Sequence, residues 1–170
     1  KGYITREVLR WKRVWLTLLD FRIADEALTQ EMSAKFLEIL PTKTHLFPYT
    51  IEALDYLKGK NYPLHLITNG FEETQLRKLR HAGIESYFTC IVTSESAGSL
   101  KPHRGIFDFA LQQVNTTSAE SIMVGDTLEV DILGAKEVGM DQVYFNPNTP
   151  AVSFQPTYTI QHLKELMDIL

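Results

Sequence analysis

Two aspartates five positions apart give the strongest chemical signal in the sequence. They lie in the segment VGDTLEVDILGA (residues 124–135), where Asp126 ends a short apolar run and Asp131 falls in the first turn of an expected helix. A turn between them can bring the two carboxylates together. Converging carboxylates raise each other's pKa unless a cation lies between them, and magnesium takes one or two carboxylates together with phosphate oxygens and water. The pair predicts a magnesium site, whereas the alternative assigns Asp131 to a helix cap and Asp126 to a turn.

Lys101 lies in the polar loop 94–102, which follows another apolar run. Pro102 suits the first turn of the next helix, so it places Lys101 at the entrance of that helix. The helix dipole disfavours a cation at this end. A lysine here therefore suggests an anionic partner, such as a phosphate or a carboxylate. The alternative is a solvated loop lysine.

Thr68, Asn69 and Gly70 form a third polar cluster, between an apolar run and an expected helix. A threonine hydroxyl, together with the backbone N–H groups at the start of a helix, makes a site for an anion. The alternative is that Asn69 and Gly70 simply form a turn.

Short apolar strands alternate with helices from about residue 50 onward. The expected strands are 64–68, 89–93, 121–124 and 142–145, and the expected helices are 51–57, 72–82, 103–114, 132–138 and 160–170. Unalternated apolar strands, each followed by a helix, predict a parallel sheet covered on both faces. The fold class is therefore α/β, with a Rossmann-like three-layer arrangement. Ligands of such sheets bind beyond the carboxyl ends of the strands, which is where all three polar clusters lie.

Residues 1–43 have a different sequence pattern, which is typical of two amphipathic helices. Apolar residues recur at helical spacing, and we expect the two faces to pack as a core: Ile4, Val8, Trp11, Trp15 and Leu18, then Leu28, Met32, Phe36 and Leu40. Thr5 is the expected N-cap of the first helix, and Pro41 ends the second. The predicted organisation is a helical part, 1–43, followed by an α/β part, 44–170.

Composition excludes several classes of protein. The chain has 170 residues, a net charge of -4 and a hydrophobic fraction of 44%, which suits one domain with a small appendage. The charge argues against a nucleic-acid polymer as partner, and no apolar run is long enough to span a membrane. The single cysteine, Cys90, fits a small buried hydrophobe and a reducing, cytoplasmic location.

The order of the three clusters carries a resemblance to a known family. The chain has Thr68 at the end of an expected strand, then Lys101 and Pro102 in a loop. Gly125 and Asp126 follow at the end of a later strand, with Asp131 beyond them. This order resembles motifs II, III and IV of the haloacid dehalogenase superfamily. The resemblance runs from about residue 47 to the C-terminus and includes the segments KPHRGIF and PTYTIQHLKEL. It implies the α/β core of that superfamily over 44–170, and the rear part of a helical cap over 1–43. The pattern is most similar to phosphatases of the pyrimidine 5'-nucleotidase kind.

The resemblance also implies a role for each residue. Thr68, with the backbone of Asn69 and Gly70, would bind the transferring phosphoryl group, and Lys101 would stabilise the nucleophile and the charge that develops on phosphate. Asp126 would ligate Mg²⁺, and Asp131 would ligate it through water or orient the ligand. The expected activity is magnesium-dependent hydrolysis of a small phosphorylated metabolite through an aspartyl-phosphate. Identity of the substrate and oligomeric state stay open.

Motif I of the superfamily, Asp-x-Asp-x-Thr after an apolar strand, is absent. The one candidate, residues 18–23, has Arg22 where the second aspartate belongs. The resemblance therefore implies that the nucleophile and the general acid/base lie upstream of Lys1, and that this chain alone is inactive. It also implies a gap between the strands at 64–68 and 121–124, because the missing strand lies between them in the superfamily.

Other functions compete with the phosphatase. A haloacid dehalogenase shares the fold but has no metal step, so the acid at Asp126 favours the phosphatase. A phosphomutase would be distinguished by cap residues upstream. A non-catalytic scaffold would have no packing reason to keep Thr68, Lys101, Asp126 and Asp131 together, and a receiver-like signalling domain has a different order of motifs. His103, Arg104 and Glu129 lie near the motifs and are expected to be solvated surface residues.

Overall fold

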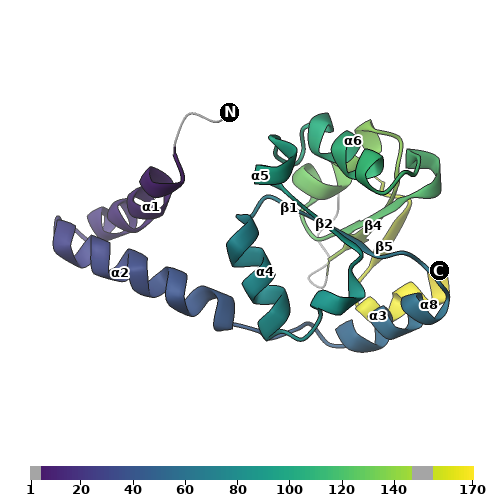
Figure 1. Ribbon diagram of the computed structural model, residues 1–170, viewed down its shortest axis with the longest axis horizontal. Helices are drawn as coiled ribbons and strands as arrows, with labels where there is room; N and C mark the ends of the chain where they lie inside the picture. Colours follow the sequence, from purple (N-terminus) through teal and green to yellow (C-terminus); the bar gives the residue numbers. More distant parts are fainter. Residues whose placement is uncertain (1–4, 147–154) are drawn as a thin grey trace. The chain divides into compact units, whose positions relative to one another are not determined.

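The computed structural model describes residues 5–146 and 155–170. The chain divides into two compact units, Lys1–Thr44 and His45–Leu170, and the division expected from the sequence lay after residue 43. The first unit contains the helices α1 (Arg6–Asp20) and α2 (Glu26–Ile39), followed by the 3-10 turn η1 (Leu40–Thr42). Figure 1 shows these elements in purple and blue. That this unit is part of a cap stays a prediction.

Both helices of the first unit begin at side-chain caps. The hydroxyl of Thr5 accepts a hydrogen bond from the N–H of Val8 at 3.4 Å, as the sequence predicted, and Asp25 caps α2 in the same way through the N–H of Leu28 at 2.9 Å. Each cap satisfies one of the N–H groups that a helix start leaves without a partner inside the helix.

The core expected between these helices forms only in part. Leu18 is buried, but Met32 and Phe36 are 43% and 41% exposed. Trp11 and Trp15 stack on each other, with ring centroids 5.0 Å apart. Two helices cover only one face of each other, so apolar side chains on the remaining faces stay at the surface. Ile4, which was expected on the same face, lies outside the described residues.

The second unit alternates helices and strands as predicted. Its elements in chain order are α3 (Thr50–Gly59), β1 (His65–Thr68), α4 (Glu72–His81), the 3-10 turn η2 (Glu85–Tyr87), β2 (Cys90–Thr93), α5 (Ser94–Ala97), α6 (Arg104–Gln113), the 3-10 turn η3 (Ser118–Glu120), β3 (Ile122–Gly125), the π-helical turn η4 (Leu128–Ile132), α7 (Leu133–Glu137), β4 (Asp141–Phe145), β5 (Tyr158–Ile160), the 3-10 turn η5 (Leu163–Glu165) and α8 (Leu166–Ile169).

The strands form two separate parallel sheets. β1 pairs with β2, which places Thr68 beside Thr93 at the carboxyl end. β3, β4 and β5 form the second sheet in that order, with Gly125 beside Tyr144. The predicted parallel α/β fold is confirmed. Among the described residues no backbone pairing joins β1 to β3, which agrees with the gap expected between those strands.

Helices cover both faces of the strands and make three layers. On one side, α6 and α7 pack against residues of both sheets, and Ile106 and Phe107 of α6 are fully buried there with Val92 of β2. On the other side, α3 and α8 cover β4 and β5 around Val143 and Ile160. Figure 1 shows α6 on one side of the strands, and α3 with α8 on the opposite side. The layer of α6 and α7 gives the two sheets a common apolar core. Cys90 lies partly buried against that core.

The C-terminal helix expected over 160–170 is partly wrong. Tyr158–Ile160 forms the strand β5 instead, and only Leu166–Ile169 is α-helical. Ile160 pairs with Phe145 of β4 and is 1% exposed. The run Tyr-Thr-Ile has the β-branched and aromatic residues that suit a strand, and the edge of β4 provides the backbone partners.

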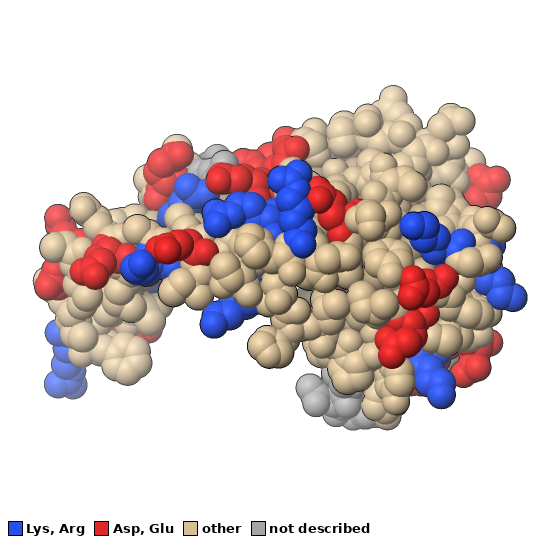
Figure 2. Space-filling view, turned by 60° about the horizontal axis from the view of Figure 1, so that its bottom comes forward, with Lys and Arg blue, Asp and Glu red and all other residues tan. Residues whose placement is uncertain are grey.

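Charged side chains of both signs occur together on the face that Figure 2 shows. Three ion pairs with exposed side chains are Lys35–Glu38 at 2.8 Å, Arg80–Glu85 at 3.0 Å and Arg104–Asp108 at 2.9 Å. Exposed pairs of this kind contribute about 0–1 kcal/mol each. Among the described helices, none is long and apolar enough to cross a membrane.

Replacement of Ile160 by alanine tests the strand β5. Because the side chain is buried against β4 and α3, Ile160→Ala should lower the free energy of unfolding by about 2–5 kcal/mol. Tyr158→Ala, which truncates an exposed side chain of the same strand, should cost less than about 1 kcal/mol. Urea unfolding measures both. Equal costs would contradict the burial of Ile160.

Candidate functional site

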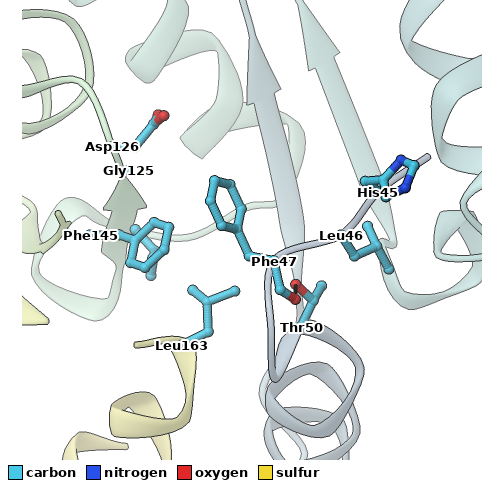
Figure 3. Close-up of a pocket in the computed structure, with 9 residues that line it drawn as sticks. His45, Leu46, Phe47, Thr50, Gly125, Asp126, Phe145 and Leu163 are labelled. Atoms are coloured by element: carbon cyan, nitrogen blue, oxygen red, sulfur yellow. Dashed lines mark hydrogen bonds between the residues drawn. The ribbon is translucent and has the colours of Figure 1, made fainter. Parts of the chain in front are cut away.

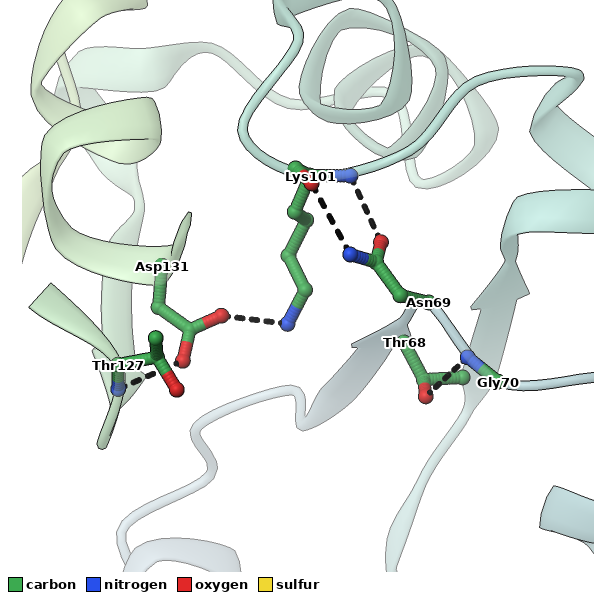
Figure 4. A network of polar contacts seen from close by, with 6 residues as sticks. All are labelled: Thr68, Asn69, Gly70, Lys101, Thr127 and Asp131. Carbon is green, nitrogen blue, oxygen red and sulfur yellow. Dashed lines mark hydrogen bonds and ion pairs between the residues drawn. The ribbon is translucent and has the colours of Figure 1, made fainter. Parts of the chain in front are cut away.

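A buried ion pair joins the loops that follow β2 and β3. The Nζ atom of Lys101 lies 2.6 Å from Oδ1 of Asp131, and the two side chains are only 11% and 7% exposed. The sequence predicted an anionic partner for Lys101, and in this structure the partner is a carboxylate of the same chain. In Figure 4 the side chain of Lys101 extends from its loop toward Asp131.

The place of Lys101 differs from the expected one. α6 begins at Arg104 with His103 as its N-cap residue, so Pro102 precedes the helix instead of lying in its first turn. Lys101 belongs to a turn that is closed by the N–H of His103 donating to the carbonyl of Leu100 at 2.8 Å. Arg104 forms an exposed pair with Asp108 and Glu129 is exposed, as expected for surface residues.

A second contact joins the loop after β1 to the same lysine. The side-chain Nδ2 of Asn69 donates to the carbonyl of Lys101 at 2.9 Å, and the N–H of Lys101 donates to Oδ1 of Asn69 at 2.7 Å. Together with the ion pair, this contact brings the loops after β1, β2 and β3 to one place (Figure 4). The resemblance implied only a backbone role for Asn69. Its side-chain role went unseen because the partner is 32 residues away.

Thr68 ends β1, directly before Asn69. Its hydroxyl oxygen accepts a hydrogen bond from the N–H of Gly70 at 3.0 Å. A hydroxyl has one donor besides its acceptor lone pairs, so Thr68 can still donate its own proton to an anion. The N–H of Glu72 at the start of α4 donates to Glu95 at 2.8 Å. One of the helix-start N–H groups that the sequence offered to an anion therefore has a partner within the chain.

Asp131 reaches back to the turn that contains Asp126. Its Oδ2 atom accepts a hydrogen bond from the N–H of Thr127 at 3.1 Å, while its Oδ1 atom holds Lys101. A Cβ placed on Gly125 would lie 2.4 Å from the Cβ of Asp131. Only glycine permits this approach, so Gly125 and Thr127 place Asp131 against the residues on either side of Asp126.

Asp126 is the acid of the site that stays exposed. In the described part of the chain, no hydrogen bond or ion pair engages its carboxylate. Magnesium binds through one or two carboxylates and keeps several waters or phosphate oxygens as its other ligands, so Asp126 suits a direct ligand. Asp131 suits an indirect one, because its two oxygens already hold Lys101 and Thr127. Among the described residues no group of three or more His, Cys, Asp or Glu side chains forms a complete metal cluster.

A hollow of about 360 Å³ opens beside Asp126. Its lining comes from β3, β4, η5 and the segment that leads into α3: His45, Leu46, Phe47, Thr50, Val124, Gly125, Asp126, Phe145 and Leu163. Phe47 and Phe145 meet edge to face with centroids 5.1 Å apart. Figure 3 shows Asp126 at one end of the hollow and the apolar side chains below it. The hollow is mainly apolar, and its one carboxylate is Asp126.

Replacement of Asp131 by asparagine tests the buried ion pair. The substitution keeps the shape and an acceptor for Thr127, but it leaves the ammonium of Lys101 without its counter-charge. Loss of one partner of a buried pair costs about 3–5 kcal/mol, whereas Asp108→Asn, which breaks the exposed pair with Arg104, should cost about 0–1 kcal/mol. Urea unfolding compares the two variants. A loss for Asp131→Asn no larger than that for Asp108→Asn would contradict a buried pair.

Replacement of Gly125 by alanine tests the close approach to Asp131. The added methyl group must displace Asp131, so Gly125→Ala should lower the free energy of unfolding by about 1–3 kcal/mol. Gly59→Ala is the matched control, because a Cβ there meets nothing within 4 Å and alanine favours a helix. The control should be neutral or more stable by up to about 1 kcal/mol. Two neutral substitutions would refute the close approach.

Comparison with known proteins gives a consistent result. Residues 17–145 match the family model described as haloacid dehalogenase-like hydrolase. The chain is 36% identical over 126 residues to pyrimidine 5'-nucleotidase YjjG of Escherichia coli (strain K12), covering 72% of this chain and 56% of that protein. It is also 36% identical over 130 residues to the glyceraldehyde 3-phosphate phosphatase of Methanocaldococcus jannaschii, covering 73% of this chain and 56% of that protein.

The fold has a close structural counterpart. The HAD-hydrolase YfnB of Bacillus subtilis, in a crystal form bound to magnesium, superposes with a TM-score of 0.86 at 28% sequence identity over 99% of this chain and 73% of that one. The resemblance inferred from Thr68, Lys101, Asp126 and Asp131 is confirmed at the level of the family. The chain spans 56% of the length of the nucleotidase and of the phosphatase.

Proposed function

We propose that this chain, which belongs to the haloacid dehalogenase-like hydrolase family, forms the larger part of a magnesium-dependent phosphomonoester hydrolase. The observation that carries the proposal is the convergence of three loops at the carboxyl ends of parallel strands. The ammonium of Lys101 binds Asp131 and the backbone of Lys101 binds the side chain of Asn69, next to Thr68. In the described part of the chain, the carboxylate of the second acid, Asp126, has no hydrogen bond or ion pair. A cation and a metal ligand set together at a crevice suit the transfer of a phosphoryl group.

Each residue has a distinct part in the proposed reaction. Thr68 would donate its hydroxyl proton to an oxygen of the phosphoryl group, and the backbone at Asn69 and Gly70 would help to hold that group. The ammonium of Lys101 would stabilise the charge that develops on the phosphoryl oxygens. Asp126 would hold magnesium, which when bound would neutralise charge on those oxygens. Asp131 would orient Lys101 through the 2.6 Å ion pair.

The nucleophile in this proposal is an aspartate upstream of Lys1. Its carboxylate would attack phosphorus, the bond from phosphorus to the ester oxygen would break, and the alcohol would leave. Water would then attack the aspartyl-phosphate and release inorganic phosphate. Two observations support an added strand that carries this residue. Among the described strands, β1 pairs only with β2 and β3 only with β4, and strands with unpaired backbone groups favour the addition of another strand. The apolar hollow beside Val124 of β3 supports the same place for it.

The proposed substrate is a small phosphorylated metabolite. The chain is similar both to a pyrimidine 5'-nucleotidase and to a glyceraldehyde 3-phosphate phosphatase, so nucleoside monophosphates and triose phosphates are the first esters to test. The single cysteine supports a reducing compartment, and we propose the cytoplasm.

Phosphate release by the full-length protein tests this function. We expect hydrolysis of small phosphate esters in the presence of magnesium, loss of hydrolysis with a chelator, and no action on 2-haloacids. Residues 1–170 alone should release no phosphate, because Thr68, Lys101 and Asp126 can bind a phosphate but cannot attack it. If a folded full-length protein with magnesium released no phosphate from a broad panel of esters, the scaffold alternative would stand. Dehalogenation that resists the chelator would favour a haloacid dehalogenase.

Substitutions in the full-length protein test the proposed roles. Lys101→Ala should lower the rate by about a hundred-fold or more, because it removes a preorganised charge from the developing phosphate charge. Asp126→Asn should also reduce activity severely, since it weakens the metal site. Glu129→Gln, at an exposed position in the same turn, should leave the rate nearly unchanged. Similar rates for Asp126→Asn and Glu129→Gln would rule out Asp126 as the metal ligand.

A further inference from the structure

Asn69 contacts both ends of the loop that carries Lys101. Its main-chain carbonyl accepts a hydrogen bond from the hydroxyl of Ser94 at 3.2 Å, at the start of that loop. Its side-chain amide binds the N–H and the carbonyl of Lys101, at 2.7 Å and 2.9 Å. Asn69 therefore forms hydrogen bonds with the loop between β2 and α6 both near its beginning and near its end.

These contacts hold the main chain of Lys101, at the other end of the residue from its ammonium group. A lysine side chain has four flexible methylene groups, so its charged end is well placed only if both the main chain and the ammonium are held. Asp131 holds the ammonium, and the amide of Asn69 holds the main chain. Both hydrogen-bonding groups of the Lys101 backbone go to this one side chain (Figure 4).

The loop has local contacts of its own that do not need Asn69. Thr93 and Ser96 form a capping box at the start of α5, and the N–H of His103 donates to Leu100 beyond the lysine. Asn69 is exposed and adds little to the apolar core. Its amide thus acts on the placement of Lys101 more than on the folding of the loop.

We propose that Asn69 is a positioning residue whose side-chain amide fixes the backbone of Lys101 and so delivers its ammonium to the phosphoryl group. This role rests on the proposed phosphatase function and is separate from phosphate binding by the backbone of the same turn. Misplacement of a catalytic group by about 1 Å can cost about a hundred-fold in rate, which is the scale of effect expected when the two hydrogen bonds are lost.

A double-mutant cycle in the full-length protein tests the proposal. The variants are Asn69→Ala, Lys101→Ala and the combination, assayed for phosphate release with magnesium. Asn69→Ala should lower kcat by about 10–100-fold and change KM less. In the Lys101→Ala background the same substitution should change kcat by less than about two-fold, because the residue through which it acts is gone. Thr117→Ala, which removes a hydrogen-bonded side chain bound to Glu120 at 2.7 Å outside the site, should leave the rate unchanged.

The outcomes separate this role from the function on which it rests. If Asn69→Ala lowered kcat by the same factor with and without Lys101, the positioning role would be overturned. The proposed phosphatase function would still stand as long as the wild-type protein is active. A wild-type protein without phosphatase activity would overturn both. Circular dichroism checks that each variant is folded. If Asn69→Ala does not fold, Asn69→Ser, which keeps a polar side chain too short to reach both groups, takes its place in the same cycle.

Discussion

The buried ion pair between Lys101 and Asp131 is the interaction on which the site depends. Two charges removed from water are stable only if each has close partners. Asp131 meets this condition by binding the ammonium with one oxygen and the N–H of Thr127 with the other. The absence of a side chain at Gly125 is what lets Asp131 come so close. The loops after β2 and β3 are therefore held together by electrostatics, although no strand pairing joins their two sheets in the described part of the chain.

The ion pair explains how two separate sheets can still form one site. The helices α6 and α7 give both sheets a common apolar core, and the polar contacts of Lys101 join their loops at the carboxyl ends. The same arrangement leaves Asp126 exposed beside an apolar hollow. A site with one engaged acid, one unengaged acid and a fixed cation suits a metal ion and a phosphoryl group, which together bring the charges that balance it.

Local patterns predicted most of this fold. The strands β1, β2 and β3 were recognisable because each is a short apolar run with a polar cluster after it. The pairing of Asn69 with the backbone of Lys101 could not be predicted, because it links residues 32 apart through groups that every residue has. The exposure of Met32 and the strand at Ile160 were missed since neighbours elsewhere in the chain decide them, as β4 does for Ile160.

In the proposed reaction, residues 1–170 bind and activate a phosphoryl group that a residue upstream of Lys1 attacks. Peptide mapping of the full-length protein, acid-quenched during turnover of a phosphate ester with magnesium, tests it most directly. We expect a phosphoryl adduct on an aspartate that precedes Lys1, and none on Thr68, Asp126 or Asp131. A covalent adduct on any residue between Lys1 and Leu170 would contradict it.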